Sequence, residues 1–179
     1  GHYDHSGGFT TLIEKGKKDF DLIVSKHFFQ KKYKLGDGVE KYIGNKFDYD
    51  YLVEHNIKLD ILDEDTKMIF PDVFAVGNFE RFFNESTEEI FLVNDHKDLF
   101  DDEISLVVNG EKGLIILVGC SHPGIRNIVK TISERFKKPI YAIIGGTHLR
   151  NASKERIVET SNYFKSLNIE KIGVSHCTG

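Results

Sequence analysis

The sequence is poor in cysteine, with only Cys120 and Cys177 among its 179 residues. Two cysteines cannot form the multi-bridge framework that stabilises small secreted proteins, so a disulfide scaffold is excluded. No signal-peptide pattern is visible either. We therefore expect a reduced, cytoplasmic protein.

Long apolar runs and an excess of positive charge are also lacking. No stretch approaches the ~20 consecutive apolar residues that a membrane helix needs, so we expect no membrane partner. Lys and Arg number 24 against 28 Asp and Glu, a net charge of -4, which argues against a nucleic-acid partner. A small-molecule substrate is the remaining expectation, and the sequence leaves the oligomeric state open.

What is present suits one globular domain spanning residues 1–179, since 40% of the residues are hydrophobic and no repeat or low-complexity linker interrupts the chain. In the last third, three short apolar runs bounded by glycine predict buried strands at 113–120, 139–146 and 171–175. Between them, apolar residues at helical spacing predict one helix over 125–136 and a second over about 157–167.

A histidine follows each of the three runs: His122, His148 and His176. Strands that end together place their terminal residues along one edge of a sheet, where a metal or ligand can bind. A single histidine after a strand is more often a turn or packing residue. Three in the same structural position favour a metal site, whereas we interpret His27, His55 and His96 as surface or packing residues.

The chain opens with a fourth cluster, His2-Tyr3-Asp4-His5, followed by Ser6-Gly7-Gly8. Imidazole and carboxylate both suit Zn²⁺ and related divalent ions, so this cluster is a second candidate set of ligands. Two simpler interpretations stay open, because Gly-His can be a cloning remnant and Asp4 or Ser6 can cap a helix.

Together these motifs resemble a known family. The pattern His2-x-Asp4-His5 with the following glycines resembles the later part of the HxHxDH signature of the metallo-β-lactamase fold. The strings GCSHPGI, IIGGTHL and SHCTG are similar to the branch of 7,8-dihydropterin-6-yl-methyl-4-(β-D-ribofuranosyl)aminobenzene 5'-phosphate synthases and related hydrolases. The resemblance implies an α/β (α+β) fold, a four-layer αββα sandwich. Because the first His of the signature would precede Gly1, we expect a fragment that lacks the N-terminal part of this sandwich.

By the same resemblance, His2 and His122 hold a first metal ion, while Asp4, His5 and His176 hold a second. Asp4 would also act in catalysis by orienting a hydroxide.

His148 occupies the place where many members of the fold have a bridging Asp. A neutral imidazole bridges two cations poorly, so we expect His148 to bind one metal or to act near it. Flavodiiron relatives have Glu where this chain has His2, which favours one or two Zn²⁺ ions, with Mn²⁺ or Fe²⁺ as alternatives.

The favoured function is hydrolysis of a small ester or phosphate-bearing molecule by a metal-bound hydroxide. The alternatives are a synthase-like transferase, as in the resembled branch, and a metal-binding module without turnover. Cys120 lies two residues before His122; we interpret it as a small buried residue, with a role at the metal as the alternative.

The middle of the chain is less informative. We expect helices over 8–18 and 48–56, and strands at 22–24, 57–61 and 73–77. We also expect a hairpin from 104–108 to 114–118 connected by residues 109–113, because Asn109-Gly110 favours a tight turn. Residues 77–102 look irregular. In this stretch we expect Phe79, Arg81, Phe82 and Phe83 to pack within the loop rather than to contact a substrate.

Overall fold

The computed structural model describes residues 1–16, 19–85 and 89–179. They form two compact units. The first unit comprises Gly1–Asp63 and Glu89–Asp102, and the second comprises Glu64–Glu88 and Glu103–Gly179.

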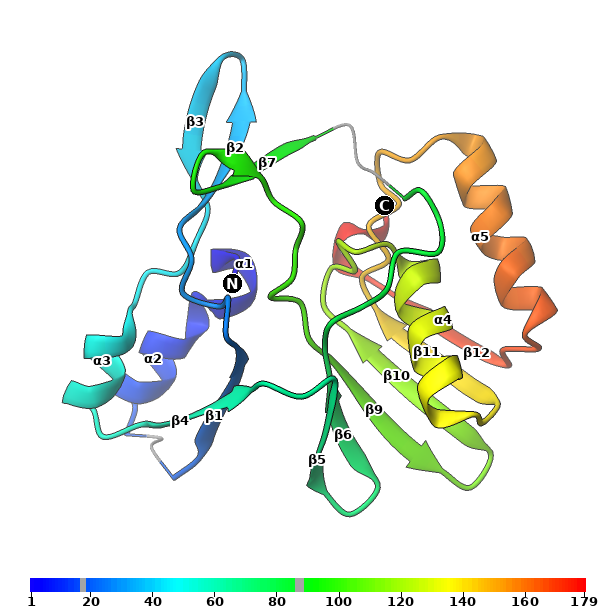
Figure 1. The fold of residues 1–179 in the computed structure, drawn as a ribbon, viewed down its shortest axis with the longest axis horizontal. Helices are drawn as coiled ribbons and strands as arrows, with labels where there is room; N and C mark the ends of the chain where they lie inside the picture. Colours follow the sequence, from blue (N-terminus) through cyan, green and yellow to red (C-terminus); the bar gives the residue numbers. More distant parts are fainter. Residues whose placement is uncertain (17–18, 86–88) are drawn as a thin grey trace. The chain divides into compact units, whose positions relative to one another are not determined.

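The second unit is built on a six-stranded sheet of order β12-β11-β10-β9-β6-β5 (Figure 1). Its strands are β5 (Thr66–Phe70), β6 (Val73–Val76), β9 (Ser105–Gly110), β10 (Gly113–Val118), β11 (Ile140–Gly145) and β12 (Lys171–Val174). Strands β10, β11 and β12 are parallel neighbours, while β9 pairs antiparallel with both β10 and β6. The three predicted apolar runs are therefore adjacent strands of one sheet.

Helices α4 (Ile125–Phe136) and α5 (Lys154–Ser166) connect the three parallel strands. Because successive strands step in one direction across the sheet, the right-handed crossover rule places both helices on the same face. Helix α4 begins after Gly124, whose φ is 97°; a Cβ there would lie 2.3 Å from Glu85 Oε2, so only glycine fits. Helix α5 begins at Ser153, whose side chain accepts a hydrogen bond from the Arg156 amide.

Burial alternates along the central strands of this sheet. Val107, Ile116 and Ile143 are paired neighbours, and all three are 0% exposed in the core formed with α4 and α5. Leu106 and Ile144 lie on the opposite face and are 37% and 45% exposed. The core of the second unit thus lies between the sheet and its two helices.

The first unit contains two small sheets and three short helices. Strands β1 (Asp21–Ser25) and β4 (Lys58–Leu62) form a parallel pair. The other sheet has the order β3-β2-β7-β8, with β2 (Lys32–Gly36), β3 (Val39–Tyr42), β7 (Ile90–Val93) and β8 (His96–Lys97). The helices are α1 (Tyr3–Ser6), α2 (Gly8–Glu14) and α3 (Tyr49–Glu54). An aromatic-rich core contains Ile13 of α2 and Leu52 of α3 together with Phe47 and Ile57, and Leu22 of β1 and Leu59 of β4 pack against it.

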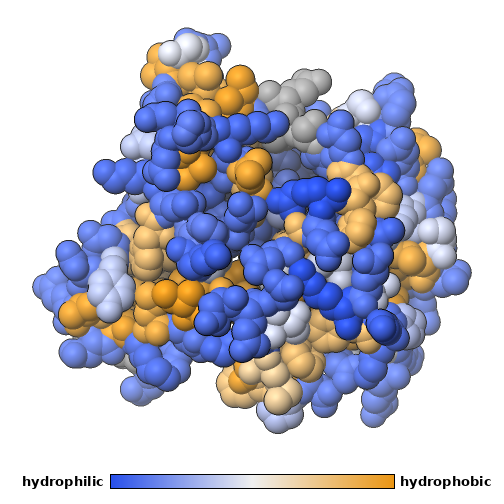
Figure 2. Space-filling view, in the orientation of Figure 1, coloured by the Kyte–Doolittle hydropathy of each residue, from blue (hydrophilic) through white to orange (hydrophobic). Residues whose placement is uncertain are grey.

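Two hairpins carry exposed apolar side chains, which appear as orange atoms in Figure 2. In the first unit, Val39 of the β2–β3 hairpin is 67% exposed. In the second unit, Met68 and Phe70 of β5 are 63% and 69% exposed. Among the described residues, no helix is long and apolar enough to cross a membrane.

Most predicted elements are confirmed, including both helices between the apolar runs and the strands at 22–24, 57–61 and 73–77. The helix predicted over 8–18 ends at Glu14, and its predicted last residues, Lys17 and Lys18, lie outside the described residues. The stretch 77–102 is less irregular than predicted, because β7 and β8 lie within it.

The predicted hairpin is confirmed and its turn lies within the predicted connection 109–113, but Asn109-Gly110 does not form that turn. Gly110 pairs with Gly113, so the two-residue turn is Glu111-Lys112 and Asn109 lies within β9. The Asn109 side chain donates to Asp72 and accepts from Lys138, which holds it in the strand.

Candidate metal centre

The sheet of the second unit ends in three histidine-bearing loops. Val118, Gly145 and Val174 are in register at the ends of β10, β11 and β12, so the loops that follow begin at the same edge. These loops carry His122, His148 and His176, as the sequence predicts. The rings of His122 and His148 lie together, with centroids 4.8 Å apart.

Hydrogen bonds join the three loops to one another. Gly146 N donates to Gly119 O over 2.9 Å, and Ser121 Oγ donates to Gly146 O over 2.7 Å. On the other side, Thr147 N donates to Thr178 Oγ1 over 3.1 Å, which ties the loop after β11 to the 3-10 turn His176–Thr178. Each histidine therefore sits in a loop whose backbone is fixed by its neighbours.

Ser121, His148 and His176 adopt left-handed backbone conformations, with φ of 61°, 52° and 58°. Residues other than glycine rarely adopt this conformation, although histidine does so more often than most. Such backbone geometry persists where the surrounding structure enforces it, and it clusters at functional sites. Each of the three loops contains one such residue, although the same backbone conformation also occurs at turns elsewhere in the chain.

Glu103 is a residue of this edge that the sequence reasoning missed. Its carboxylate lies 2.8 Å from His122 Nδ1 and also accepts hydrogen bonds from the amides of Ser121 and His122. Both the His122 and Glu103 side chains are 9% exposed. A carboxylate on Nδ1 fixes the tautomer with the lone pair on Nε2, which is the arrangement typical of metal-binding histidines. The predicted hairpin pointed to this residue. Because β9 runs antiparallel to β10, the start of β9, which Glu103 precedes, lies at the edge where β10 ends.

Both cysteines lie at the same edge. Cys120 is 4% exposed, which agrees with the interpretation of a small buried residue, and its sulfur lies within 4.8 Å of a ring nitrogen of His176. A hydrogen bond with the Cys120 side chain, together with the nearby imidazoles of His176 and His122, lowers the pKa of the Cys177 thiol to about 6. The second unit thus offers imidazole and thiol donors side by side.

The other predicted ligands, His2, Asp4 and His5, belong to the first unit. His2 immediately precedes helix α1, and its ring stacks on Phe91 with centroids 5.7 Å apart and meets the edge of Phe100 at 6.0 Å. Asp4 and His5 are more exposed, and Asp4 Oδ2 lies 3.7 Å from His5 Nε2. The opening motif therefore combines one histidine packed among aromatic rings with a neighbouring carboxylate–imidazole pair.

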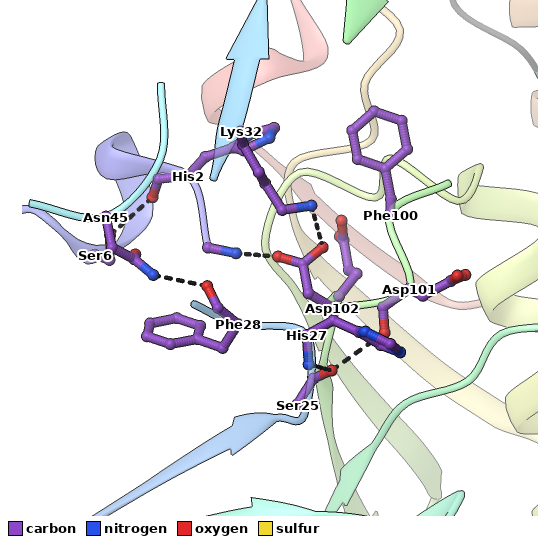
Figure 3. Close-up of polar contacts among 12 residues, drawn as sticks. His2, Ser6, Ser25, His27, Phe28, Lys32, Asn45, Phe100, Asp101 and Asp102 are labelled. Carbon is purple, nitrogen blue, oxygen red and sulfur yellow. Dashed lines mark hydrogen bonds and ion pairs between the residues drawn. The ribbon is translucent and has the colours of Figure 1, made fainter. Parts of the chain in front are cut away.

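The simpler interpretation of this motif, helix capping, is wrong. Neither α1 nor α2 has a side-chain cap hydrogen bond, and Ser6 Oγ instead donates to the His2 carbonyl. Figure 3 shows this bond together with the charged group beside His2.

That charged group centres on a buried lysine. Lys32 is 1% exposed, and its Nζ lies 2.6 Å from Asp98 and 2.7 Å from Asp102. Asp98 also accepts a hydrogen bond from the Phe100 amide. The ion pair therefore helps to position the Phe100 ring, which contacts His2. Burial raises the pKa of Asp102, whereas the neighbouring ammonium group of Lys32 lowers it.

His55, Phe79 and Phe83 pack against neighbouring residues, as predicted. His55 stacks on Tyr51 at 4.1 Å and hydrogen-bonds its carbonyl. Phe79 is buried in the core of the second unit, and Phe83 packs on Tyr163.

No family model matches the chain. It is 32% identical to the 7,8-dihydropterin-6-methyl-4-(β-D-ribofuranosyl)-aminobenzene-5'-phosphate synthase of Methanocaldococcus jannaschii over 99% of the chain and 64% of that protein. It is also 32% identical to an uncharacterized protein of the same organism, over all of the chain and 66% of that protein.

Among solved structures, the chain matches the crystal structure of Tm1679, a metal-dependent hydrolase of the β-lactamase superfamily. The TM-score is 0.87 and the identity 32%, over all of the chain and 66% of that structure. The chain thus spans about two thirds of the length of each of these relatives. These matches show that the chain has a metallo-β-lactamase-like fold and is similar in sequence to the dihydropterin-ribofuranosylaminobenzene phosphate synthase of Methanocaldococcus jannaschii.

Proposed function

We propose that the chain is the metal-binding part of an enzyme that hydrolyses a small ester or phosphate-bearing molecule. The observation that carries the proposal is the meeting of His122, His148 and His176 at one sheet edge, with Glu103 fixing the His122 ring. The likeness to a metal-dependent hydrolase of the same fold supports it.

The donor atoms present fit a divalent metal. Imidazole and carboxylate are the usual ligands of Zn²⁺ and also suit Mn²⁺ and Fe²⁺, and a nearby thiol favours the softer Zn²⁺. The proposed ligands are those predicted from the sequence: His2, Asp4, His5, His122, His148 and His176. When bound, divalent metal supplies Lewis acidity and a more acidic water.

The residues of the chain contribute positioning and proton transfer around that metal. Glu103 keeps the His122 proton on Nδ1, which leaves the lone pair on Nε2 available to a metal. Phe91 and Phe100 restrict the ring of His2. Asp4, the proposed catalytic residue, is exposed enough to accept a proton from water and to pass it to solvent.

A synthase-like transfer reaction is the second candidate, because the matched Methanocaldococcus protein is named as a synthase. The two reactions differ in what they consume. A hydrolase needs only its substrate and water, whereas the synthase-like reaction would require a dihydropterin diphosphate as co-substrate. Product formation measured with and without that co-substrate separates the two, and metal binding without any turnover would favour the metal-binding module instead.

The first test is metal content. Elemental analysis of protein purified without added metal should give about one or two equivalents of zinc, manganese or iron. The double variant His122→Ala, His148→Ala should lose that metal, whereas the matched control His55→Ala should keep it, since His55 packs on Tyr51. Equal metal in all three proteins would contradict the proposed ligand set.

A further inference from the structure

The two cysteines of the chain lie together although 57 residues separate them. The Cys177 thiol donates to the Cys120 carbonyl over 3.4 Å and also forms a hydrogen bond with the Cys120 side chain. Both residues belong to the second unit, so their proximity is set within one compact body.

The backbone around the thiols is fixed on both sides. Gly146 N donates to Gly119 O, Ser175 N donates to Gly145 O, and Arg150 N donates to Cys177 O. A Cβ on Gly146 would lie 2.7 Å from Cys177 Sγ, so glycine leaves the space that the sulfur occupies. The loops are therefore arranged to bring these two sulfur atoms together.

The two thiols differ in access to solvent. Cys120 is buried, whereas Cys177 is only partly buried. An oxidant in solution therefore reaches Cys177 first, and Cys120 is in place to react with the product.

We propose that Cys120 and Cys177 form a redox-active pair that closes into an intramolecular disulfide under mild oxidation. A hydroperoxide is reduced by two electrons as the Cys177 sulfur attacks its outer oxygen, which gives a sulfenic acid and water or an alcohol. The Cys120 thiol then attacks the Cys177 sulfur, forming the S–S bond and releasing the sulfenic oxygen as water. A dithiol reductant reverses the reaction.

Closure has a consequence for the proposed metal centre, and this part rests on the proposed function. A disulfide requires an S–S distance of about 2.0 Å, much shorter than the distance of a thiol hydrogen bond. Closure therefore draws together Cys120, which lies two residues before His122, and Cys177, which lies one residue after His176, and we expect it to shift these two histidines. We expect the oxidised chain to bind metal about tenfold more weakly, or worse, than the reduced chain.

The test starts from the metal-free, reduced chain treated with hydrogen peroxide in the presence of a chelator. Tryptic digestion without reductant should give peptide 113–126 linked to peptide 172–179, at a mass lower by two hydrogen atoms than the sum of the two. Addition of dithiothreitol should separate them. Absence of the linked peptide, dimers joined through Cys177, or separate sulfinic acids on the two cysteines would overturn the proposal.

Two variants test the order of events. In Cys120→Ser, Cys177 should accumulate as a sulfenic acid that dimedone traps, and in Cys177→Ser, Cys120 should stay reduced under the same treatment. Oxidation of Cys120 at the wild-type rate in Cys177→Ser would contradict the assigned roles. Because the linked peptide forms without metal, this result stands even where the chain binds no metal. Metal titration of reduced and oxidised chains then tests the coupling separately.

Discussion

Glu103 shows how one side chain can position a proposed metal ligand that lies on another element. Its carboxylate accepts hydrogen bonds from the His122 ring N–H and from two backbone amides of the loop after β10. It thereby fixes both the tautomer of the ring and the path of the loop. Carboxylates that contact a metal-binding histidine in this way typically affect metal affinity by 10–100-fold when removed.

We therefore predict that Glu103→Gln weakens zinc binding by about 10–100-fold, because the amide no longer holds the Nδ1 proton by charge. The dissociation constant is measured by competition with a chromophoric chelator. The matched control is Glu111→Gln, in the exposed turn of the same hairpin, which should bind zinc as the wild type does. Identical affinities for both variants would remove Glu103 from the site.

The candidate site could be predicted from the sequence only in part. The histidines after β10, β11 and β12 were visible because each follows a strong apolar run. Glu103 was missed because it is a single carboxylate in the acidic run Asp101-Asp102-Glu103, and only the pairing of β9 with β10 brings it to His122.

Helix α4 contacts the segment around Phe83 through the buried side chain of Asn127. Asn127 is 0% exposed; its Oδ1 accepts the Phe83 amide, and its Nδ2 donates to the carbonyls of Phe83 and Pro123. This side chain thus connects α4 both to the backbone at Phe83 and to Pro123, in the loop that precedes the helix. A buried amide that satisfies three backbone groups is costly to remove.

Asn127→Ala should lower the free energy of unfolding by about 1–3 kcal/mol, because it leaves buried backbone groups without partners. Urea denaturation measures the loss. The exposed Asn151→Ala serves as the control and should change stability little. Hydrogen exchange at the Phe83 amide should also accelerate in Asn127→Ala; unchanged protection there would mean that other contacts hold the segment.

Helices and strands were predicted correctly where the pattern of apolar residues was long and regular. The stripe of apolar residues over α4 and the glycine-bounded runs of β10 and β11 are such patterns. Strand β7 was missed although Ile90–Val93 is an apolar run that favours a strand, because the run is only four residues long and its flanks are polar. Strand β8 has two residues and forms by pairing with β7. Asn109-Gly110 does not form the turn of the hairpin because contacts with Asp72 and Lys138 outweigh the turn preference of Asn-Gly.

For the whole molecule, the buried ion group of the first unit couples folding to pH. Lys32 lies between Asp98 and Asp102, and all three side chains are at most 8% exposed. Removing one partner of such a group leaves an uncompensated buried charge, which typically costs 3–5 kcal/mol. Because Asp98 also holds Phe100 beside His2, the same group links the stability of the unit to the geometry of its histidine.

The direction of the pH dependence follows from the pairing of Asp102 with Lys32, which lowers the pKa of this carboxyl from its ordinary value of 3.8. A carboxyl whose pKa is lower in the folded state stabilises the fold fully above the unfolded-state pKa, and this contribution is lost as the pH falls through the lower folded-state pKa. Urea denaturation between pH 6 and 2 should show this loss in the wild type.

Asp102→Asn should show much less of this acid dependence, since it has no proton to take up, while the exposed Asp63→Asn should keep the wild-type profile. Asp102→Asn should also be less stable than the wild type at pH 6, where the carboxylate is fully charged and paired with Lys32. Parallel stability profiles for the wild type and Asp102→Asn would mean that Asp102 has the same pKa in the folded and unfolded chain. In that case Asp98 alone would neutralise the buried lysine.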